Sequence, residues 1–342
     1  MKAMVMRGHG GTEVLKLEDI PDPQATAGMV VVRVRAVATN HLDVWVRKGW
    51  PGLKLEWPHR LGADVAGVVE AVGPGVQGVA AGDEVVVNPG LSCGRCRACL
   101  LGRDDECRQY SILGEHRSGG YSELLAVPGQ NILPKPKKLS FDEAACVPLT
   151  FLTAWHALVT RANLRPGETA LIHAAGSGVG SAGIQVARLV GATVIATAGS
   201  DWKCEKAKAL GAHHVVNYEK QDFLAEVRTL TGKRGVDVVF EHVGKATWEK
   251  SILACALGGR VVTVGATTGY DPPTDLRQVF YRRLSLLGST MGSKGELFDV
   301  LRFFDEGKLR PVLDRTLPLA DAPKAHELLT SRAQFGKVVL KP

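Results

Sequence analysis

The stretch of sequence that decides the fold is Thr169-Ala170-Leu171-Ile172-His173-Ala174-Ala175-Gly176-Ser177-Gly178-Val179-Gly180-Ser181-Ala182-Gly183. Its first seven residues are a short, largely apolar run that ends at glycine, which is typical of a buried parallel strand. A helix should follow, because apolar or small residues recur with helical spacing at Val179, Ala182, Gly183, Val186, Ala187 and Val190. Gly191 is expected to end this helix. Strand, glycine turn and helix together predict an α/β fold.

The glycines between this strand and helix indicate a phosphate-binding loop. Without side chains, the backbone can turn tightly and come close to a pyrophosphate, whose charge the free N–H groups of the helix start would hold. The predicted cofactor-binding residues here are Gly176, Gly178, Val179 and Gly180. A tight turn without a ligand is the alternative, but the flanking strand and helix favour a dinucleotide.

The rest of the chain divides into two kinds of sequence. Residues 152–289 alternate apolar strands with helical segments, including a helix over 247–256 and a strand over 259–266, and this predicts a Rossmann-type, doubly wound parallel sheet. The first part instead shows short β-like runs separated by glycine and proline, for example 29–38 and 64–72. A strand-like segment near the C-terminus, 336–342, should return to this first part.

We therefore predict two domains. One is β-rich and formed by residues 1–151 and 290–342, and the other is the dinucleotide-binding domain at 152–289.

Composition narrows the class of protein. The 342 residues include 42 basic and 35 acidic side chains, and no dense basic run points to nucleic acid. The longest uncharged stretch, 169–187, is interrupted by glycines, serines and a histidine, so it is not expected to span a membrane. We expect a cytoplasmic protein that acts on a small molecule.

Four cysteines form the strongest single motif. Cys93, Cys96, Cys99 and Cys107 follow the pattern Cys-x2-Cys-x2-Cys-x7-Cys, which predicts a lobe at about 90–110 that wraps one structural Zn²⁺. Because sulfur fills every tetrahedral position, no site is left for substrate. An iron–sulfur cluster or two disulfides are alternatives. A nucleic-acid-binding zinc ribbon is disfavoured because acidic residues balance the arginines of the loop.

The end of the second strand of the dinucleotide-binding domain bears on the choice of cofactor. A carboxylate is expected there if a free ribose 2′-hydroxyl is bound, but the chain reads Ala198-Gly199-Ser200. Ser200 and the nearby cation Lys203 suit a 2′-phosphate, which favours NADP(H) over NAD(H). The alternative is that Ser200 or Asp201 only caps the following helix.

The cysteine loop, the run Gly82-Asp83-Glu84-Val85, the phosphate loop and the end Gly336-Lys337-Val338-Val339-Leu340 together resemble the medium-chain dehydrogenase/reductase superfamily. This superfamily contains the zinc-type alcohol dehydrogenases and the quinone oxidoreductases, and the resemblance covers essentially the whole chain. It implies a GroES-like substrate domain formed by both chain ends, a Rossmann domain between them and an active site in the cleft. It also implies a homodimer or homotetramer paired through a strand near 285–288.

The resemblance assigns further cofactor contacts. Gly244, Gly265 and Ala266 are implied to flank the nicotinamide, and Tyr218 to contact the adenine-ribose phosphate in the NADPH-using branch. Lys337 is implied to close over the cofactor.

The chain departs from the dehydrogenase pattern at the catalytic zinc. Asn40, Ala63 and Leu149 stand where the three ligands are expected, and an amide, a methyl and an isobutyl group cannot hold the ion. The replacements, including Asp43 and Asp64, instead resemble the zinc-free quinone oxidoreductases. By this resemblance the catalytic residues are Asn40, Asp43, Asp64 and Thr153. Asn40 could donate a hydrogen bond to a carbonyl oxygen, or it could be a turn asparagine that satisfies local backbone.

The resulting prediction is an NADP(H)-dependent oxidoreductase that transfers hydride to quinones, enones or other activated carbonyls without a catalytic zinc. One alternative is an alcohol dehydrogenase whose unusual metal site uses His41, Asp43 or His59. A less favoured alternative is an NADPH-binding protein with little turnover.

Overall fold

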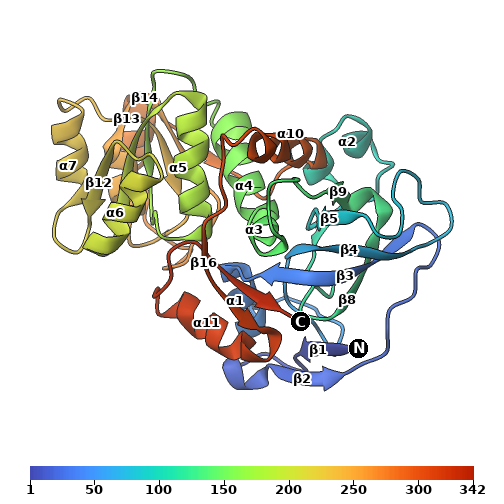
Figure 1. Cartoon of the computed structure of the whole chain (residues 1–342). Coiled ribbons are helices and arrows are strands. Elements are labelled where there is room, and N and C mark those ends of the chain that lie inside the picture. Colours follow the sequence, from blue (N-terminus) through green and yellow to red (C-terminus); the bar gives the residue numbers. More distant parts are fainter. The chain divides into compact units, whose positions relative to one another are not determined.

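The computed structural model describes residues 1–342, which divide into two compact units (Figure 1). The first unit comprises Met1–Leu149 and Ser293–Pro342, and the second comprises Thr150–Gly292. The limits expected from the sequence were 151 and 290, within a few residues of these positions.

The second unit is built on six parallel strands. Their spatial order is β12-β11-β10-β13-β14-β15, and the direction of the connections reverses between β10 and β13. In sheets of this kind, ligands bind at the carboxyl ends of the strands beside such a reversal. The strands are β10 (Thr169–Ile172), β11 (Thr193–Ala198), β12 (His214–Asn217), β13 (Val236–Glu241), β14 (Cys255–Thr263) and β15 (Ser285–Gly288).

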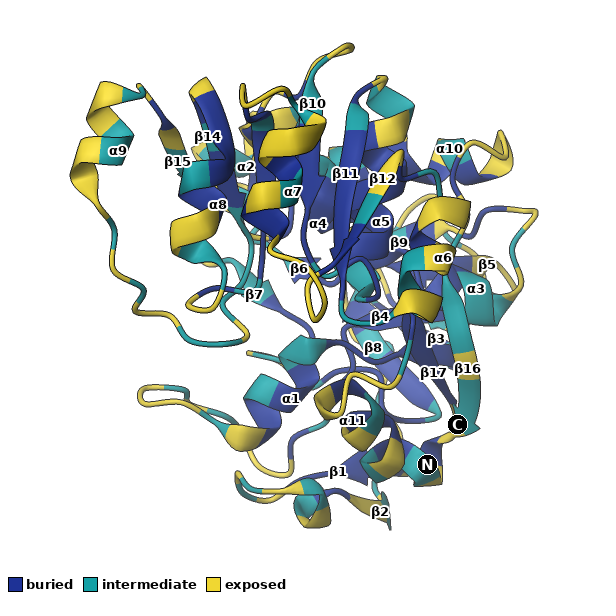
Figure 2. Cartoon of the chain, turned by 90° about the vertical axis from the view of Figure 1, so that its left-hand side faces the viewer, coloured by how far each residue is buried: buried dark blue, intermediate teal, exposed yellow.

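The central strands of this sheet are buried and helices lie along it, of which α6 and α9 are largely exposed (Figure 2). Leu171 of β10 lies in the apolar core with no exposed surface. The helices are α4 (Pro148–Trp155), which begins at the end of the first unit, α5 (Gly178–Val190), α6 (Asp201–Ala209), α7 (Phe223–Leu230), α8 (Trp248–Ala254) and α9 (Leu276–Tyr281), and a π-helical turn spans His156–Arg161.

The predicted strand–turn–helix at 169–191 is confirmed. Two boundaries differ from the prediction, one at the end of β10 and one at the end of α8. β10 stops at Ile172 because Ala174 adopts a φ of 45°, which turns the chain out of the sheet. The predicted helix over 247–256 is wrong at its end, since α8 stops at Ala254 and Cys255 begins β14. Short buried apolar segments fit either structure, and here pairing of Cys255 with Val236 of β13 decides for the strand.

The first unit is organised around a seven-stranded sheet in the order β16-β17-β3-β4-β5-β9, with β8 paired to β3. Two small sheets, β1-β2 and β6-β7, accompany it. The strands are β1 (Lys2–Val5), β2 (Lys16–Asp19), β3 (Met29–Ala38), β4 (Asp64–Val72), β5 (Glu84–Val87), β6 (Gly90–Leu91), β7 (Ser111–Ile112), β8 (Leu124–Pro128), β9 (Ile132–Pro134), β16 (Leu313–Pro318) and β17 (Lys337–Lys341).

The prediction that the C-terminal strand returns to the first part of the chain is confirmed. β17 pairs antiparallel with β3, with Val339 opposite Ala38, and Ala38 in turn lies opposite Asp64 of β4. The ends of three strands that are distant in sequence therefore meet at one place in this sheet.

Short helices surround this sheet. They are α1 (His41–Lys48), α2 (Arg97–Leu100), α3 (Phe141–Ala145), α10 (Lys294–Asp305) and α11 (Ala322–Thr330), with 3-10 turns at Thr12–Val14, Asp104–Glu106, Gly129–Asn131 and Leu319–Asp321. None of the helices in either unit has the length and apolar character needed to cross a bilayer.

Leu171→Ala should destabilise the second unit by ~2–5 kcal/mol, because the substitution leaves a cavity in a fully buried core. Urea unfolding followed by circular dichroism measures this loss. Leu257→Ala is the control, since Leu257 lies on the same sheet but is 69% exposed. Equal effects of the two substitutions would contradict the placement of β10 at the centre of the core.

Candidate active site

Three predicted site residues meet at the strand ends of the first unit. The amide nitrogen Nδ2 of Asn40 donates to Oδ2 of Asp64 at 2.9 Å, and Nζ of Lys337 donates to the same oxygen at 2.8 Å. Lys337 also donates to Oδ1 of Asn40. All three side chains are buried. The structure thus joins Asn40 and Asp64, both predicted to be catalytic, to a lysine that was predicted to contact the cofactor.

The Asp64 carboxylate is fully committed to this cluster. Its second oxygen, Oδ1, accepts the backbone N–H of Leu149 at 2.6 Å. A buried carboxylate needs an opposite charge and hydrogen-bond donors, and Lys337, Asn40 and Leu149 provide them. Asn40 and Leu149 are two of the positions where ligands of a catalytic zinc were expected, and both instead donate to one carboxylate.

Asp43 holds the backbone next to the cluster, and its predicted catalytic role stays a prediction. Its Oδ2 accepts the backbone N–H of Asn40 at 2.7 Å, and its Oδ1 accepts that of Gly62 at 2.8 Å. It therefore caps the start of α1 and joins the loops on either side of the cluster. Burial raises the pKa of Asp43 to about 6, although these two hydrogen bonds and Lys337 oppose the rise.

Thr153 lies on α4, which belongs to the second unit apart from its first two residues. The hydroxyl of Thr153 contacts Sδ of Met291 at 3.8 Å. Its predicted catalytic role stays a prediction.

The candidates for an unusual metal site do not converge. His59 is buried, and its Nε2 contacts the carbonyl of Gly114 at 3.2 Å. The ring of His41 packs edge-on against Trp45. The one group of three or more His, Cys, Asp or Glu side chains that brings its ligand atoms together is the cysteine cluster.

The four cysteine sulfurs fit a zinc ion. The Sγ atoms of Cys93, Cys96, Cys99 and Cys107 lie within 4.8 Å of one another, and the closest pairs are 3.5 to 3.9 Å apart. A tetrahedral ion with Zn–S bonds of about 2.3 Å needs sulfurs separated by about 3.8 Å. Backbone N–H groups of Arg95 and Cys96 lower the pKa of Cys93 to about 6, which favours the thiolate that binds metal.

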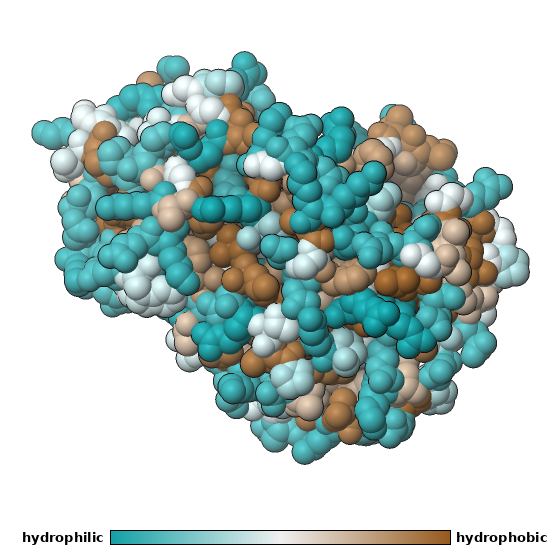
Figure 3. Space-filling model, in the orientation of Figure 1, coloured by the Kyte–Doolittle hydropathy of each residue, from teal (hydrophilic) through white to brown (hydrophobic).

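The cysteine lobe is anchored to α10. Asp104, which is buried, accepts from Nζ of Lys294 at 2.6 Å and from its backbone N–H at 2.9 Å. Nζ of Lys294 also reaches the hydroxyl of Ser92. Leu100, the last residue of α2, and the adjacent Leu101 are exposed, and the molecular surface around them is largely hydrophilic (Figure 3).

In the second unit, the predicted phosphate loop has the geometry of an anion-binding turn. Gly176 precedes α5, and Gly178, Val179 and Gly180 form its first turn. Ser177 caps the helix by accepting the N–H of Gly180 at 2.9 Å. A Cβ atom on Gly180 would lie 2.3 Å from the carbonyl oxygen of Ala174, so only glycine fits. Glycine at this position therefore lets the start of α5 pack closely against the end of β10, as the third glycine of a dinucleotide-binding turn does.

The residues after β11 leave a donor available. Ser200 occupies the N-cap position of α6, but its side chain makes no capping bond and its buried Oγ has no hydrogen-bond partner. Asp201 is turned away, because its carboxylate accepts from Asn217 at 2.8 Å and Lys220 at 2.6 Å. The hydroxyl of Tyr218 lies against Gly199, where a Cβ atom would be 2.5 Å from it. The buried Ser200 hydroxyl without a partner fits a bound ligand group at this position.

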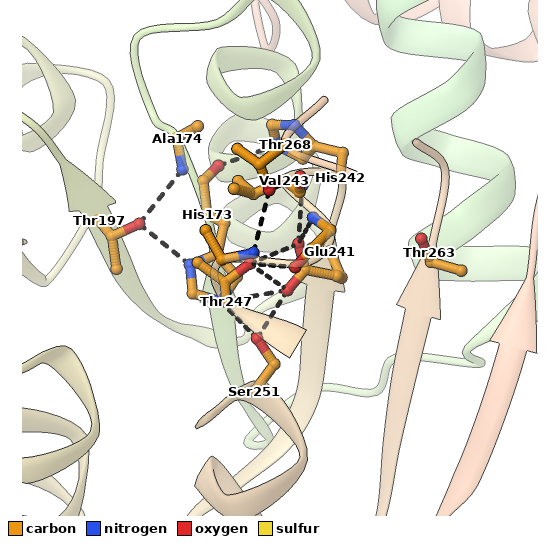
Figure 4. Close-up of polar contacts among 12 residues, drawn as sticks. His173, Ala174, Thr197, Glu241, His242, Val243, Thr247, Ser251, Thr263 and Thr268 are labelled. Carbon is orange, nitrogen blue, oxygen red and sulfur yellow. Dashed lines mark hydrogen bonds and ion pairs between the residues drawn. The ribbon is translucent and has the colours of Figure 1, made fainter. Parts of the chain in front are cut away.

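Sequence reasoning missed a buried polar network in this unit (Figure 4). Oγ of Ser251 donates to Oε2 of Glu241 at 2.7 Å and contacts Nε2 of His173 at 2.9 Å, while Nδ1 of His173 contacts Oγ1 of Thr197 at 3.1 Å. Because the Ser251 proton points to Glu241, Nε2 of His173 carries the proton and Nδ1 accepts. Burial lowers the pKa of His173, which keeps the ring neutral.

This network holds the backbone at Gly244, whose contact with the nicotinamide stays a prediction. Oε1 of Glu241 accepts the backbone N–H of Val243 at 2.7 Å and of Gly244 at 3.1 Å. Burial alone would raise the pKa of Glu241, and the hydrogen bonds from Ser251, Gly244 and Val243 oppose this rise. Gly265 and Ala266 follow β14, and Ala266 lies next to Gly244. The signal in the sequence was a pair of polar residues, His173 and Glu241, at strand ends.

The stability conferred by Asp43 should depend on pH with an unusual sign. Its pKa of about 6 in the folded protein exceeds the unfolded value of about 4, so the folded state holds the proton more tightly. The contribution is present below about pH 4 and is lost as the pH rises to about 6. Relative to Asp43→Asn, the wild type should therefore lose up to about 3 kcal/mol over this range. Urea unfolding at a series of pH values measures the difference.

His326 provides a control of opposite sign. Burial, followed by Arg47, lowers the pKa of His326 to about 3, so its contribution is lost as the pH falls from about 6.5. The stability difference between wild type and His326→Gln should rise with pH in the window where the Asp43 difference falls. Parallel slopes for the two variants would refute the assigned environments.

Comparison with known proteins agrees with this architecture. Residues 26–137 match the family model described as alcohol dehydrogenase GroES-like domain, and residues 178–306 match the one described as zinc-binding dehydrogenase. An NAD-dependent alcohol dehydrogenase of Sulfurisphaera tokodaii is 32% identical over 96% of each chain. Quinone oxidoreductase of Rattus norvegicus is 30% identical over 99% of this chain and 97% of the relative.

A crystal structure of an NAD-dependent alcohol dehydrogenase superposes with a TM-score of 0.97 at 56% identity, covering all of both chains. With both domain models matched and relatives aligned end to end, the chain belongs to the medium-chain dehydrogenase/reductase superfamily and is an oxidoreductase of the group that includes the zinc-type alcohol dehydrogenases and quinone oxidoreductases.

Proposed function

We propose that this oxidoreductase transfers hydride between NADP(H) and an activated carbonyl compound, such as a quinone or an enone, without a catalytic zinc. The observation that carries the proposal is the closed hydrogen-bonded cluster of Asn40, Asp64 and Lys337. Zinc-type catalysis needs three nitrogen, sulfur or carboxylate ligands around an open position, and the side chains at the expected ligand positions do not supply them.

An already electrophilic acceptor removes the need for a metal. The nicotinamide supplies the hydride when the cofactor is bound, and the protein orients the reactants. We assign Asn40 to the carbonyl oxygen of the acceptor. Its Nδ2 carries two N–H groups, of which one donates to Asp64. The other makes only a long contact, 3.4 Å, with the carbonyl of Ala38. A donor aimed at an oxygen that gains negative charge lowers the barrier to transfer.

The other predicted sites complete the proposal. Gly176, Gly178, Val179 and Gly180 would hold the pyrophosphate, and Gly244, Gly265 and Ala266 the nicotinamide side. The four cysteine thiolates would hold one structural Zn²⁺. We also propose a homodimer or homotetramer, supported by β15 at an open edge of its sheet, and a cytoplasmic location, supported by thiols that need a reducing compartment.

The preference for NADP(H) is proposed from Ser200, Lys203 and Tyr218. The names of several relatives specify NAD, so the choice is open to direct test. Ser200 offers a free buried hydroxyl, and the neighbouring carboxylate of Asp201 is already paired with Lys220. This arrangement suits a 2′-phosphate better than a 2′-hydroxyl that needs a carboxylate acceptor.

Asn40→Ala should lower kcat for quinone reduction about 100-fold, the usual effect of removing one donor to a developing oxyanion. The Kd for NADPH, measured by fluorescence titration, should not change. Asn131→Ala is the matched control, because it removes another buried asparagine of the same unit, one whose side chain donates to backbone carbonyls. Asn131→Ala should lower the stability of the protein and leave kcat unchanged. An unaltered kcat in Asn40→Ala would eliminate the proposed role.

NADPH should bind at least about tenfold more tightly than NADH, a difference of ~1.4 kcal/mol. Ser200→Asp should reverse this order, because the new carboxylate repels a 2′-phosphate and accepts a hydrogen bond from a 2′-hydroxyl. Fluorescence titration with both nucleotides measures the four constants. Tighter NADH binding by the wild type would instead assign the protein to the NAD-using relatives.

A further inference from the structure

The sheet of the first unit places Lys337 beside Asn40. β17 runs antiparallel to β3, and Val339 lies opposite Ala38. Continuing this register toward the start of β17 brings Lys337 level with Asn40. The relation between the two side chains is therefore set by backbone pairing.

The ammonium group of Lys337 has no access to bulk water. The side chain is 4% exposed, and that of its partner Asp64 is fully buried. Removing an ammonium ion from water costs several kcal/mol, which only a well-placed counter-ion and acceptors offset. The described acceptors of Nζ are Oδ2 of Asp64 and Oδ1 of Asn40. A buried charge held in this way fixes the groups around it.

The main consequence is a fixed orientation of the Asn40 amide. Its oxygen faces the Lys337 ammonium and its nitrogen faces the Asp64 carboxylate. The two ends of an amide are almost equal in size, so packing alone hardly distinguishes them. Here a rotation by 180° would set NH₂ against NH₃⁺ and the oxygen against a carboxylate. Charge therefore selects the one orientation that presents an N–H donor.

We propose that Lys337 is a positioning residue for hydride transfer. Together with Asp64 it locks the Asn40 amide so that the second N–H of Nδ2, which makes only a long bond of 3.4 Å to the carbonyl of Ala38, remains a donor for the carbonyl oxygen of the acceptor. This inference rests on the proposed function of Asn40. It gives Lys337 a task on the substrate side, distinct from the cofactor contact expected from the sequence.

The test compares kcat, KM for a quinone and the Kd for NADPH in Lys337→Met and Lys337→Arg. Lys337→Met should lower kcat at least about tenfold, because the amide is then free to rotate, while the Kd for NADPH stays constant. Lys337→Arg, which retains the charge, should recover part of the loss. Because both residues act through one amide, Asn40→Ala/Lys337→Met should be no slower than Asn40→Ala alone.

Two controls separate this role from folding. Lys337→Met leaves the Asp64 charge unpaired and can unfold the protein, so Asp64→Asn/Lys337→Met removes both charges and keeps an acceptor oxygen at residue 64. This pair should show the same loss of kcat with a native circular dichroism spectrum. Lys135→Met removes another buried lysine of the same unit, one that binds carbonyls of Pro136 and Leu139, and should leave kcat unchanged.

The possible failures are distinguishable. A normal kcat in both Lys337→Met and the charge-free pair, with Asn40→Ala impaired, would overturn the positioning role and leave the proposed function intact. A raised Kd for NADPH with normal kcat at saturation would assign Lys337 to the cofactor instead. If the fold losses of kcat in the two single variants multiply in Asn40→Ala/Lys337→Met, the two residues act independently and the positioning role is wrong. If Asn40→Ala is itself fully active, the proposed function fails and this inference fails with it.

Discussion

The buried ion pair between Lys337 and Asp64 is the interaction on which the substrate-side cluster depends. Neither charge can stay in the interior alone, so the last strand, β17, must dock beside β3, which pairs with β4 on its other side, before the cluster exists. The pair in turn orients Asn40, and the N–H of Leu149 closes the remaining side of the carboxylate. One electrostatic requirement thus links the C-terminus of the chain to residues from its first half.

The same pair is the reason for our proposal that this centre holds no zinc. A catalytic Zn²⁺ would add a second cation to a carboxylate that Lys337 already neutralises. It would also have to bind through an amide and backbone groups in place of imidazole and thiolate. The cysteine lobe of the same chain differs from this cluster, because four free cysteine thiols gather there at the separations that a zinc ion requires. In the function we propose, metal binding and ion pairing are used at separate places, for structure and for catalysis respectively.

Local patterns in the sequence were sufficient for much of this organisation. Periodicity and glycine punctuation around 169–191 predicted β10, the phosphate turn and α5, and cysteine spacing alone predicted the lobe. The partners of Lys337 could not be predicted, because they depend on strand register between segments separated by hundreds of residues, whereas the two partners of Asp43 lie 3 and 19 residues away. Likewise, His173 and Glu241 each looked like ordinary strand-end residues, and only the sheet order that makes β10 and β13 neighbours joins them.

Counting zinc in active protein by elemental analysis tests most directly whether an ion pair has replaced the catalytic metal. The protein should be dialysed gently and assayed for quinone reduction with NADPH on the same sample. We expect one zinc per chain, bound by the four cysteines, in fully active protein. Two zinc ions per chain, with activity that follows the loss and return of the second, would contradict the metal-free centre.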